Sequence, residues 1–195
     1  MSASTAAKAR DGTNDQKQKL VIKEVTADIW KAPPNSVLIH ACNCSGNWGS
    51  GIAKAFKDEY PRAHKLHQQF CDRCPDGIAQ AGTAQLIPPV DEDPNASDRG
   101  NKRHYIGCLF TSVGFGENVD PPDVILRYTR HAIIDLLQQI AEAKSSGEEI
   151  GEIRMCKINS VRFHTPWTKT LGVLQDIELE PGLPTQITVY NQPSK

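Results

Sequence analysis

The feature that most constrains the fold is a glycine-rich stretch between a short apolar run and a helical pattern. Residues 36–41 (SVLIHA) have the unbroken apolar character of a strand that is covered on both faces. Three glycines follow, and apolar residues then recur at the spacing of one helix face between Ile52 and Tyr60. A buried strand that leads through a loop into a helix is typical of an α/β protein.

The rest of the chain repeats this alternation. Asp120 before Pro121 is a typical helix start, with a capping carboxylate followed by a proline in the first turn. The sequence therefore predicts one α/β domain over residues 19–195, whereas the small polar residues 1–18 are expected to form a disordered tail. Further strands are expected at 19–26, 82–88, 103–110, 153–158 and 185–190, and further helices at 64–74, 121–147 and 167–177.

Composition and charge argue against several classes of partner. A chain of 195 residues has the size of one domain, and 22 Lys+Arg against 23 Asp+Glu leave a formal net charge of -1. This balance gives no reason to expect a nucleic acid or a membrane as partner, and no apolar run reaches the roughly 18 residues of a membrane span. Six cysteines without a secretory signal favour reduced thiols in a cytoplasmic or nuclear protein, which we expect to be a monomer.

The glycine loop predicts an anion site. In such sheets, ligands bind beyond the carboxyl ends of the strands, and glycines let backbone N–H groups approach a phosphate closely. An ordinary tight turn is the alternative, because the loop matches neither the dinucleotide nor the nucleoside-triphosphate pattern. A second polar loop at residues 158–167 (INSVRFHTPW) is placed to enclose the same ligand from the other side.

Five segments, taken in chain order, resemble a macrodomain: VTADIW, VLIHACNCSGNWGSGIA, YIGCLFTS, KINSVRFHTPW and ITVY. Within that family they look like the fungal ADP-ribose 1″-phosphate phosphatase branch, and the resemblance covers residues 20–190. The resemblance implies a three-layer α/β/α fold with a central mixed sheet that binds ADP-ribose. No cofactor is expected.

The resemblance also implies roles for individual residues. Asp28 and the backbone of Ile29 would bind adenine, and Asn43 would face the distal ribose as part of the catalytic site. Val161 and His164 stand where this branch usually has glycines, which allow close backbone approach. The two loops are expected to bind the rest of the ligand through Ser45, Gly46, Trp48, Gly49, Ser50, Gly51, Ile52, Ser160, Val161, Arg162, Phe163 and His164.

His40 ends the first buried strand, and two interpretations compete for it. A single buried histidine is commonly a core residue. Its position just before the anion loop, and its match to the family's histidine, favour a catalytic or phosphate-contacting role instead. Asn43 has a similar pair of interpretations, since its carboxamide is suited either to capping the loop or to gripping a ribose hydroxyl.

Two further patterns resemble known sites. Cys156 and Arg162 have the C-x5-R spacing of cysteine phosphatases, but Cys156 lies within the predicted strand and the loop lacks glycines. Residues 64–74 place two histidines and two cysteines along one helical face, and four ligands on one helix cannot converge on a zinc ion. We expect neither a cysteine nucleophile nor a metal site.

The sequence thus predicts a metal-independent phosphatase of ADP-ribose 1″-phosphate, the by-product left when tRNA splicing removes a 2′-phosphate. The alternative is a reader or a hydrolase of ADP-ribosylated proteins, which would use the same binding face. Macrodomains that remove ADP-ribose from carboxylates would carry a lysine near Ser112 and an aspartate at Phe163, and this chain has neither. The expected partners are ADP-ribose and ADP-ribose 1″-phosphate, with ADP-ribosylated proteins in the alternative.

Overall fold

The computed structural model describes residues 16–74, 76–92 and 102–191 of the chain. The helices are α1 (Gly51–Glu59), α2 (Pro61–Cys71), α3 (Pro122–Ser145) and α4 (Trp167–Gln175), with two short 3-10 helices, η1 (Ile29–Lys31) and η2 (Gly116–Asn118). The strands are β1 (Gln18–Lys19), β2 (Val21–Thr26), β3 (Val37–Asn43), β4 (Ala84–Ile87), β5 (Tyr105–Ser112), β6 (Ile153–Cys156), β7 (Glu178–Leu179) and β8 (Gln186–Asn191).

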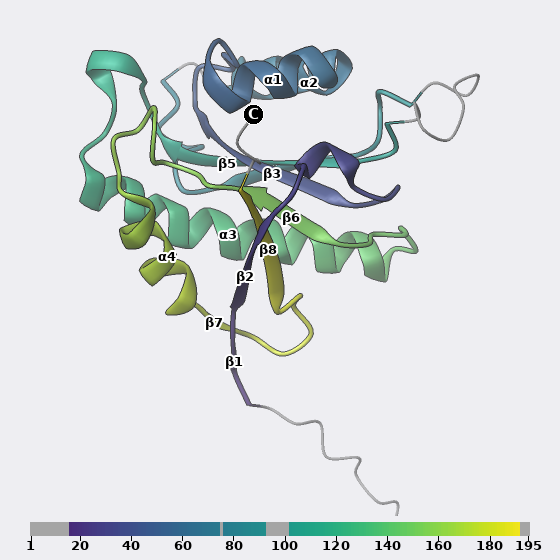
Figure 1. Ribbon diagram of the computed structural model, residues 1–195. Helices are drawn as coiled ribbons and strands as arrows, with labels where there is room; N and C mark the ends of the chain where they lie inside the picture. The colour runs from purple at the N-terminus through teal and green to yellow at the C-terminus, as the bar shows by residue number, and fades with distance from the viewer. Residues whose placement is uncertain (1–15, 75, 93–101, 192–195) are drawn as a thin grey trace, which may run out of the picture.

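A six-stranded sheet in the order β2-β8-β6-β3-β5-β4 forms the centre of the molecule. Its neighbouring strands are parallel except for β4, which runs antiparallel to β5. The sheet is therefore mixed, as expected. At one edge, β2 pairs with β8 over six residues, and the two strands lie side by side (Figure 1). Separately, β1 and β7 form a short antiparallel pair.

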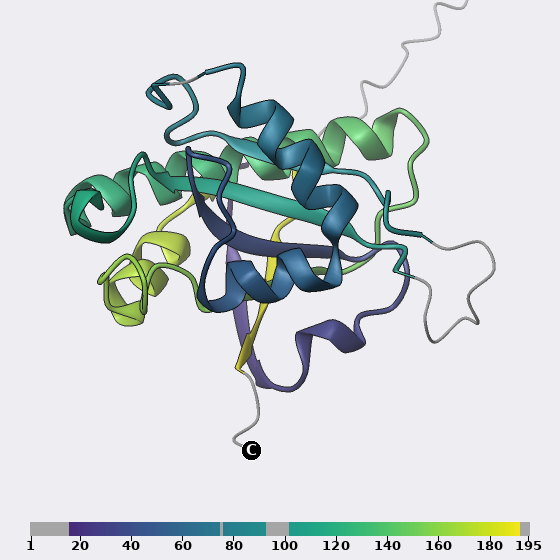
Figure 2. The ribbon, with the colours of Figure 1, turned by 90° about the horizontal axis from the view of Figure 1, so that it is seen from above.

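Helices cover both faces of this sheet. α1 and α2 lie on one face, and α3 and α4 lie on the other (Figure 1), while the view from above shows α1 and α2 in front of the sheet (Figure 2). The contacts agree, because α1 packs on β3 and α2 on β4, whereas α3 packs on β4 and β5 and α4 on β2. This arrangement confirms the three-layer α/β/α fold. The strand β5, which lies between β3 and β4, is buried over its whole length.

The predicted strands and helices are present with shifted ends, but one local prediction is wrong. Asp120 does not cap α3, because its carboxylate accepts hydrogen bonds from the N–H of Val113 (2.6 Å) and the hydroxyl of Ser112 (3.0 Å). Instead, Pro121 is the N-cap residue and α3 begins at Pro122. α1 ends at Glu59, and Pro61 then opens α2, a position that suits a residue without an N–H group.

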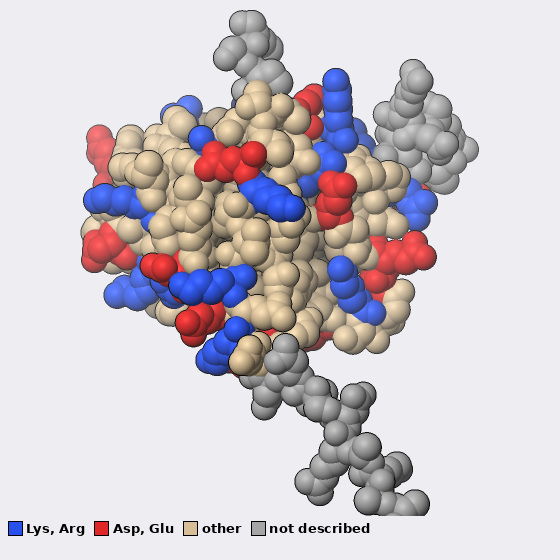
Figure 3. Space-filling model, turned by 60° about the horizontal axis from the view of Figure 1, so that its bottom comes forward, with Lys and Arg blue, Asp and Glu red and all other residues tan. Residues whose placement is uncertain are grey.

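The folded region begins before residue 19. Gln18, which belongs to the predicted tail, pairs with Leu179 in the β1–β7 pair, so the predicted boundary lies too late. Residues 1–15 of that tail lie outside the described residues. Within the described ranges, none of the helices has the length and apolar character to cross a bilayer. On the face that Figure 3 shows, acidic and basic side chains are interspersed, in keeping with the balanced net charge.

Candidate active site

A cavity of about 510 Å³ lies beyond the carboxyl ends of β3 and β6, which are neighbours in the sheet. β3 continues into α1 on one face of the sheet, and β6 continues into α4 on the other (Figure 1). Adjacent parallel strands whose helices leave toward opposite faces open a crevice between their loops, and ligands of α/β proteins bind there. The volume is in the usual range for small-molecule sites.

Two loops supply most of the cavity wall. The first joins β3 to α1 and the second joins β6 to α4, as the two polar sequences predicted. Phe115 and Gly116, which the sequence analysis did not single out, extend the wall from the segment after β5. The residues predicted for the site that do line the cavity are Asn43, Trp48, Gly49, Ser50, Gly51, Ile52, Ser160, Val161, Arg162, Phe163 and His164.

The charged residues of the cavity wall are cationic. Lys157 and Arg162 line it, and no aspartate or glutamate does so in the part of the chain that the structure describes. Lys157 is held at the rim by Glu24, with 3.3 Å between Nζ and Oε2. The indole N–H of Trp167 donates to the other oxygen of Glu24 (3.0 Å), and this hydrogen bond is the main cause that lowers the pKa of Glu24. Such a wall suits an anionic ligand.

Asn43 braces the first loop from within. Its Oδ1 accepts a hydrogen bond from the N–H of Ser45 (2.9 Å), and its Nδ2 donates to the carbonyl of Asn47 (3.4 Å). The residue is buried but still lines the cavity. These hydrogen bonds hold the loop, and the ribose contact that the sequence analysis assigned to Asn43 stays a prediction.

The glycines of the first loop serve different purposes. Gly51 has a φ of 58° at the start of α1, and a β-carbon there would lie 3.7 Å from the Cγ and Nε atoms of Arg162. Gly46 has a φ of 69°, but its β-carbon would meet Cα of Gln68 at 3.2 Å and Cβ of Cys71 at 3.3 Å. Gly46 therefore packs against α2. The structure places neither Gly46 nor Ser45 among the residues of the cavity wall, so their predicted ligand contact is not supported.

Asn159 fixes the second loop, a role that the sequence analysis did not assign. Its φ is 66°, in the left-handed region that asparagine tolerates better than most residues. The hydroxyl of Thr111 donates to its Oδ1 (2.9 Å), and its Nδ2 donates to the hydroxyl oxygen of Thr129 (2.9 Å). All three side chains are buried. The loop is thus tied to β5 and to α3 by a hydrogen-bonded polar group in the core.

The two residues that replace the usual glycines of the second loop differ in conformation. His164 has a φ of 52°, where a glycine would avoid the steric cost of a β-carbon. Val161 is not among the residues with positive φ, and its side chain is 78% exposed. Only His164 therefore strains the backbone, and its side chain lines the cavity.

The structure does not support the catalytic prediction for His40. Its side chain is completely buried, its ring stacks on that of Phe56 with 4.3 Å between centroids, and it contacts Trp48 edge-on at 4.6 Å. Because Phe56 belongs to α1, these contacts direct the ring of His40 toward the α1/α2 layer. His40 does not line the cavity wall, so the core interpretation is the one the structure favours.

Three other predicted contact residues also need a revised description. The indole of Trp48 is only 1% exposed and packs on the rings of His64 and His67, so it supports the wall from behind. Asp28 accepts a hydrogen bond from the N–H of Trp30 (3.0 Å) and caps η1, while Ile29 is fully buried. Neither Asp28 nor Ile29 lines the cavity. Their contact with adenine stays a prediction for the carboxyl end of β2, at the same edge of the sheet.

Cys156 lies at the cavity wall, but its chemistry is not that of a nucleophile. Burial raises the pKa of the thiol to about 12, and Sγ donates to the carbonyl of Ile39 (3.6 Å). Cysteine phosphatases need a lowered pKa that yields a thiolate. The expectation that the C-x5-R spacing is accidental agrees with this environment.

No protein-family model matches the chain, but curated relatives do. The ADP-ribose 1″-phosphate phosphatase of Aspergillus fumigatus is 40% identical over 185 residues, covering 82% of this chain and 91% of the relative. The protein of that name from Chaetomium globosum is 45% identical over 166 residues, covering 84% and 88%. The chain belongs to the ADP-ribose 1″-phosphate phosphatase family.

Solved structures confirm the fold. The macrodomain of Thermus aquaticus DarG has a TM-score of 0.59 at 20% identity, covering 88% of this chain and 98% of the other. DarTG of Thermosipho africanus, solved in complex with ADP-ribose, has a TM-score of 0.62 at 16% identity, covering 91% and 43%. At these identities the likeness shows a macrodomain fold and nothing about the ligand of this chain.

In this macrodomain, the two positions at which the sequence analysis looked for a lysine and an aspartate hold Ser112 and Phe163. The hydroxyl of Ser112 lies 2.9 Å from the carbonyl of Gly114 and 3.0 Å from the Asp120 carboxylate. Phe163 is buried and presents an aromatic surface to the cavity. Neither position offers an amine or a carboxylate, so a covalent lysine mechanism has no side chains here.

Proposed function

We propose that this macrodomain hydrolyses ADP-ribose 1″-phosphate to ADP-ribose and inorganic phosphate. The observation that carries the proposal is the cavity between the two loops, whose wall has cationic and backbone groups but no acidic residue within the described ranges. The support from relatives is that proteins 40% and 45% identical over most of their length are named for this activity.

The start of α1 suits the diphosphate. No side chain caps this helix, so the N–H groups of its first turn are available to a ligand. The positive end of the helix dipole favours an anion at the same place. Arg162 stands opposite, close to Gly51, and its guanidinium group can donate to a phosphate from the second loop.

The reaction requires water to attack phosphorus while the bond between phosphorus and the anomeric oxygen breaks. Positive charge from Arg162 would stabilise the transferred phosphoryl group, and the loops would hold it in line with the water. His164 lines the cavity, and an imidazole is the most common acid/base group in enzymes. It takes the acid/base role that the sequence analysis gave to His40, either by deprotonating the water or by protonating the leaving oxygen.

The proposal extends to the origin of the substrate. The ester is the by-product of 2′-phosphate removal in tRNA splicing, so the protein would work in the cytoplasm or the nucleus. Asp28, at the carboxyl end of β2, would contact adenine at the far end of the bound ligand.

Release of inorganic phosphate from ADP-ribose 1″-phosphate by purified protein tests the proposal, with ADP-ribose binding measured by calorimetry on the same preparation. We expect turnover, and we expect ADP-ribose to bind and to inhibit as the product. A protein that binds ADP-ribose with no phosphate release would instead be a reader, and the proposed activity would be wrong.

A further inference from the structure

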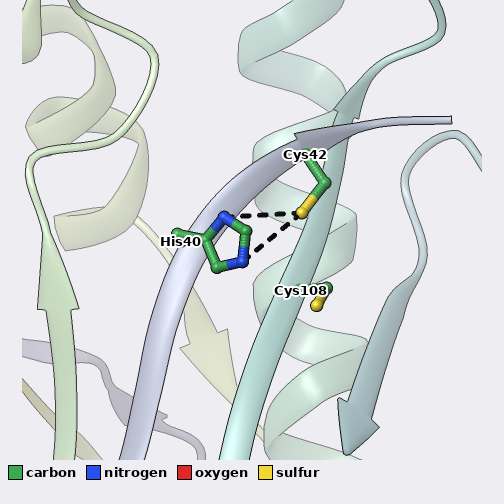
Figure 4. Close-up of side chains that lie close together, drawn as sticks. All are labelled: His40, Cys42 and Cys108. Carbon is green, nitrogen blue, oxygen red and sulfur yellow. Dashed lines mark hydrogen bonds between the residues drawn. The ribbon is translucent and has the colours of Figure 1, made fainter. Parts of the chain in front are cut away.

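Three potential metal ligands converge inside the molecule on the α1/α2 side of the sheet. They are His40 and Cys42 from β3 and Cys108 from β5, and their donor atoms all lie within 4.8 Å of one another (Figure 4). All three side chains are buried. His40 is the register partner of Cys108, and Cys42 follows on the same face of its strand. Two adjacent buried strands therefore hold the donor atoms together.

His40 has an incomplete set of hydrogen bonds. In the described part of the chain, the one hydrogen-bond partner of its ring nitrogens is the sulfur of Cys42, at 3.6 Å from Nδ1 and 3.8 Å from Nε2. A single thiol cannot satisfy both nitrogens of an imidazole, and buried polar groups normally have partners. One nitrogen of a completely buried ring is thus left without a suitable partner, next to two thiols.

α2 brings a fourth donor to this place. The ring of His67 is completely buried, and its Nδ1 lies 3.0 Å from Oε1 of Gln85. Because an amide oxygen only accepts, Nδ1 carries the proton, and Nε2 is an acceptor that lies 3.7 Å from the thiol of Cys71. A hydrogen bond of this kind orients histidines that bind metals. The Cys42 thiol is among the neighbours that interact with His67, so its ring borders the three-residue cluster.

We propose that His40, Cys42 and Cys108 bind a Zn²⁺ ion, with His67 as the fourth ligand. Bonds of about 2.0 Å to nitrogen and about 2.3 Å to sulfur give a tetrahedral N···S edge of about 3.5 Å. The observed 3.6 Å between His40 Nδ1 and Cys42 Sγ fits that edge. The two thiols lose their protons to solvent as the Zn–S bonds form. Two thiolates then cancel the charge of the ion, so the dry interior gains no net charge.

The ion would be structural. Phe56 and Trp48 pack against His40, and all three ligands are buried, with Cys42 next to the cavity wall. A metal at this place would join the end of β3, from which the first loop emerges, to β5 and α2. The sequence analysis expected no metal site because the ligands of one helix cannot converge. In the fold, only one ligand, His67, comes from that helix, and the other three come from strands of the sheet, so the ligands can converge.

Metal content of the wild-type protein is the first test. Protein without an affinity tag, purified without chelators and dialysed, should retain about one zinc per chain in elemental mass spectrometry. Cys108→Ser should lose the metal, whereas Cys74→Ser, which changes a cysteine outside the cluster, should retain it. Wild-type protein that contains no zinc, and takes up none when refolded with it, would overturn the proposal.

Cobalt gives a readout that needs no variant to fold. Wild-type protein refolded with Co²⁺ should show sulfur-to-cobalt charge transfer in the near ultraviolet and the strong visible bands of a tetrahedral site. Absence of both would overturn the proposal even if Cys108→Ser does not fold. The site rests on the fold and not on the proposed function, and both measurements are made without substrate, so a failed phosphatase assay would leave them unaffected.

Discussion

Gly51 and Arg162 bring the two loops of the cavity together, since a β-carbon at Gly51 would lie 3.7 Å from both Cγ and Nε of Arg162. Gly51 opens α1, so the arginine side chain lies beside the first turn of that helix. A phosphate at this point can contact backbone N–H groups from one loop and a guanidinium group from the other.

Replacement of Arg162 by glutamine is expected to lower kcat for ADP-ribose 1″-phosphate by about 10²–10³-fold, because a charged donor to the transition state is lost. The affinity for ADP-ribose should fall much less. Phosphate release and calorimetry measure the two effects. Arg127→Gln, an exposed change on α3, is the matched control. If Arg162→Gln turned over at the wild-type rate, the guanidinium group of Arg162 would have no part in the mechanism.

His164→Gly should separate backbone strain from chemistry. Glycine accepts the φ of 52° without the cost of a β-carbon, so the variant should gain roughly 1 kcal/mol of unfolding free energy. Turnover should nevertheless fall by about 10²–10⁴-fold, because the acid/base group is lost. Urea denaturation and phosphate release on one preparation test both halves. A stable variant with unchanged turnover would show that the imidazole of His164 takes no part in the reaction.

Asn159 offers a paired comparison. Asn159→Gly keeps the left-handed backbone but removes the acceptor of the Thr111 hydroxyl and the donor to the Thr129 hydroxyl, which still donates to the carbonyl of Ile125. This loss should cost about 1–3 kcal/mol of unfolding free energy. Asn159→Ala should cost roughly 1 kcal/mol more, because alanine also resists the positive φ. Chemical denaturation of the two variants gives the difference. Equal stabilities would mean that the loop relaxes its backbone when the side chain is removed.

Cys156→Ser should retain turnover close to that of the wild type. Burial raises the pKa of this thiol to about 12, so a thiolate nucleophile does not form at neutral pH. A serine hydroxyl can replace the thiol as donor to the carbonyl of Ile39. Activity should also survive treatment with iodoacetamide. A loss of turnover in folded Cys156→Ser would revive the cysteine phosphatase interpretation.

Stability should fall as the solution becomes acidic, and His104 is one cause. Its Nε2 donates to the carbonyl of Ala32 (3.0 Å), so its Nδ1 accepts from the hydroxyl of Tyr60 (2.8 Å), and the ring is neutral. Burial lowers its pKa below the ordinary 6.5. Below pH 6.5, His104 therefore takes up a proton in the unfolded chain but stays neutral in the folded chain. Because the unfolded chain binds more protons, the free energy of unfolding decreases as the pH falls from 6.5 toward the folded pKa.

Melting temperatures between about pH 7 and about pH 5 measure this dependence. His104→Gln removes the titrating group and should show a weaker decline, although it starts from a lower melting temperature. Surface variants such as Arg127→Gln should follow the wild type. If the melting temperature of His104→Gln fell with pH as steeply as that of the wild type, groups other than His104 would cause the acid sensitivity.

Local patterns made much of the fold predictable. The strand, glycine loop and helix at β3 and α1 lie next to one another in the chain, so apolar periodicity and glycine content identify them directly. The same holds for the second loop between β6 and α4. Both loops line the cavity as expected, because the carboxyl ends of neighbouring parallel strands meet at one edge of the sheet.

The role of His40 could not be predicted in this way. β3 is apolar on both faces, so its sequence has no alternation that tells which side chains point toward the cavity and which toward α1. Contacts between segments that are distant in the sequence could not be predicted either. Asn159 depends on Thr111 and Thr129, and Lys157 depends on Glu24, and only the completed fold brings these residues together.

The pairing of β2 with β8 has a consequence for biosynthesis. Residues 21–26 leave the ribosome early, but within the described part of the chain their only partners in the large sheet are residues 186–191. The edge of the sheet can therefore close only after all the intervening segments have emerged, and contacts so distant in sequence form slowly. Until then β2 presents unpaired backbone groups and the side chains of Val21 and Val25, which invites pairing with other chains. We expect translation speed and chaperone supply to affect the yield of this protein more than that of a helical protein of equal length.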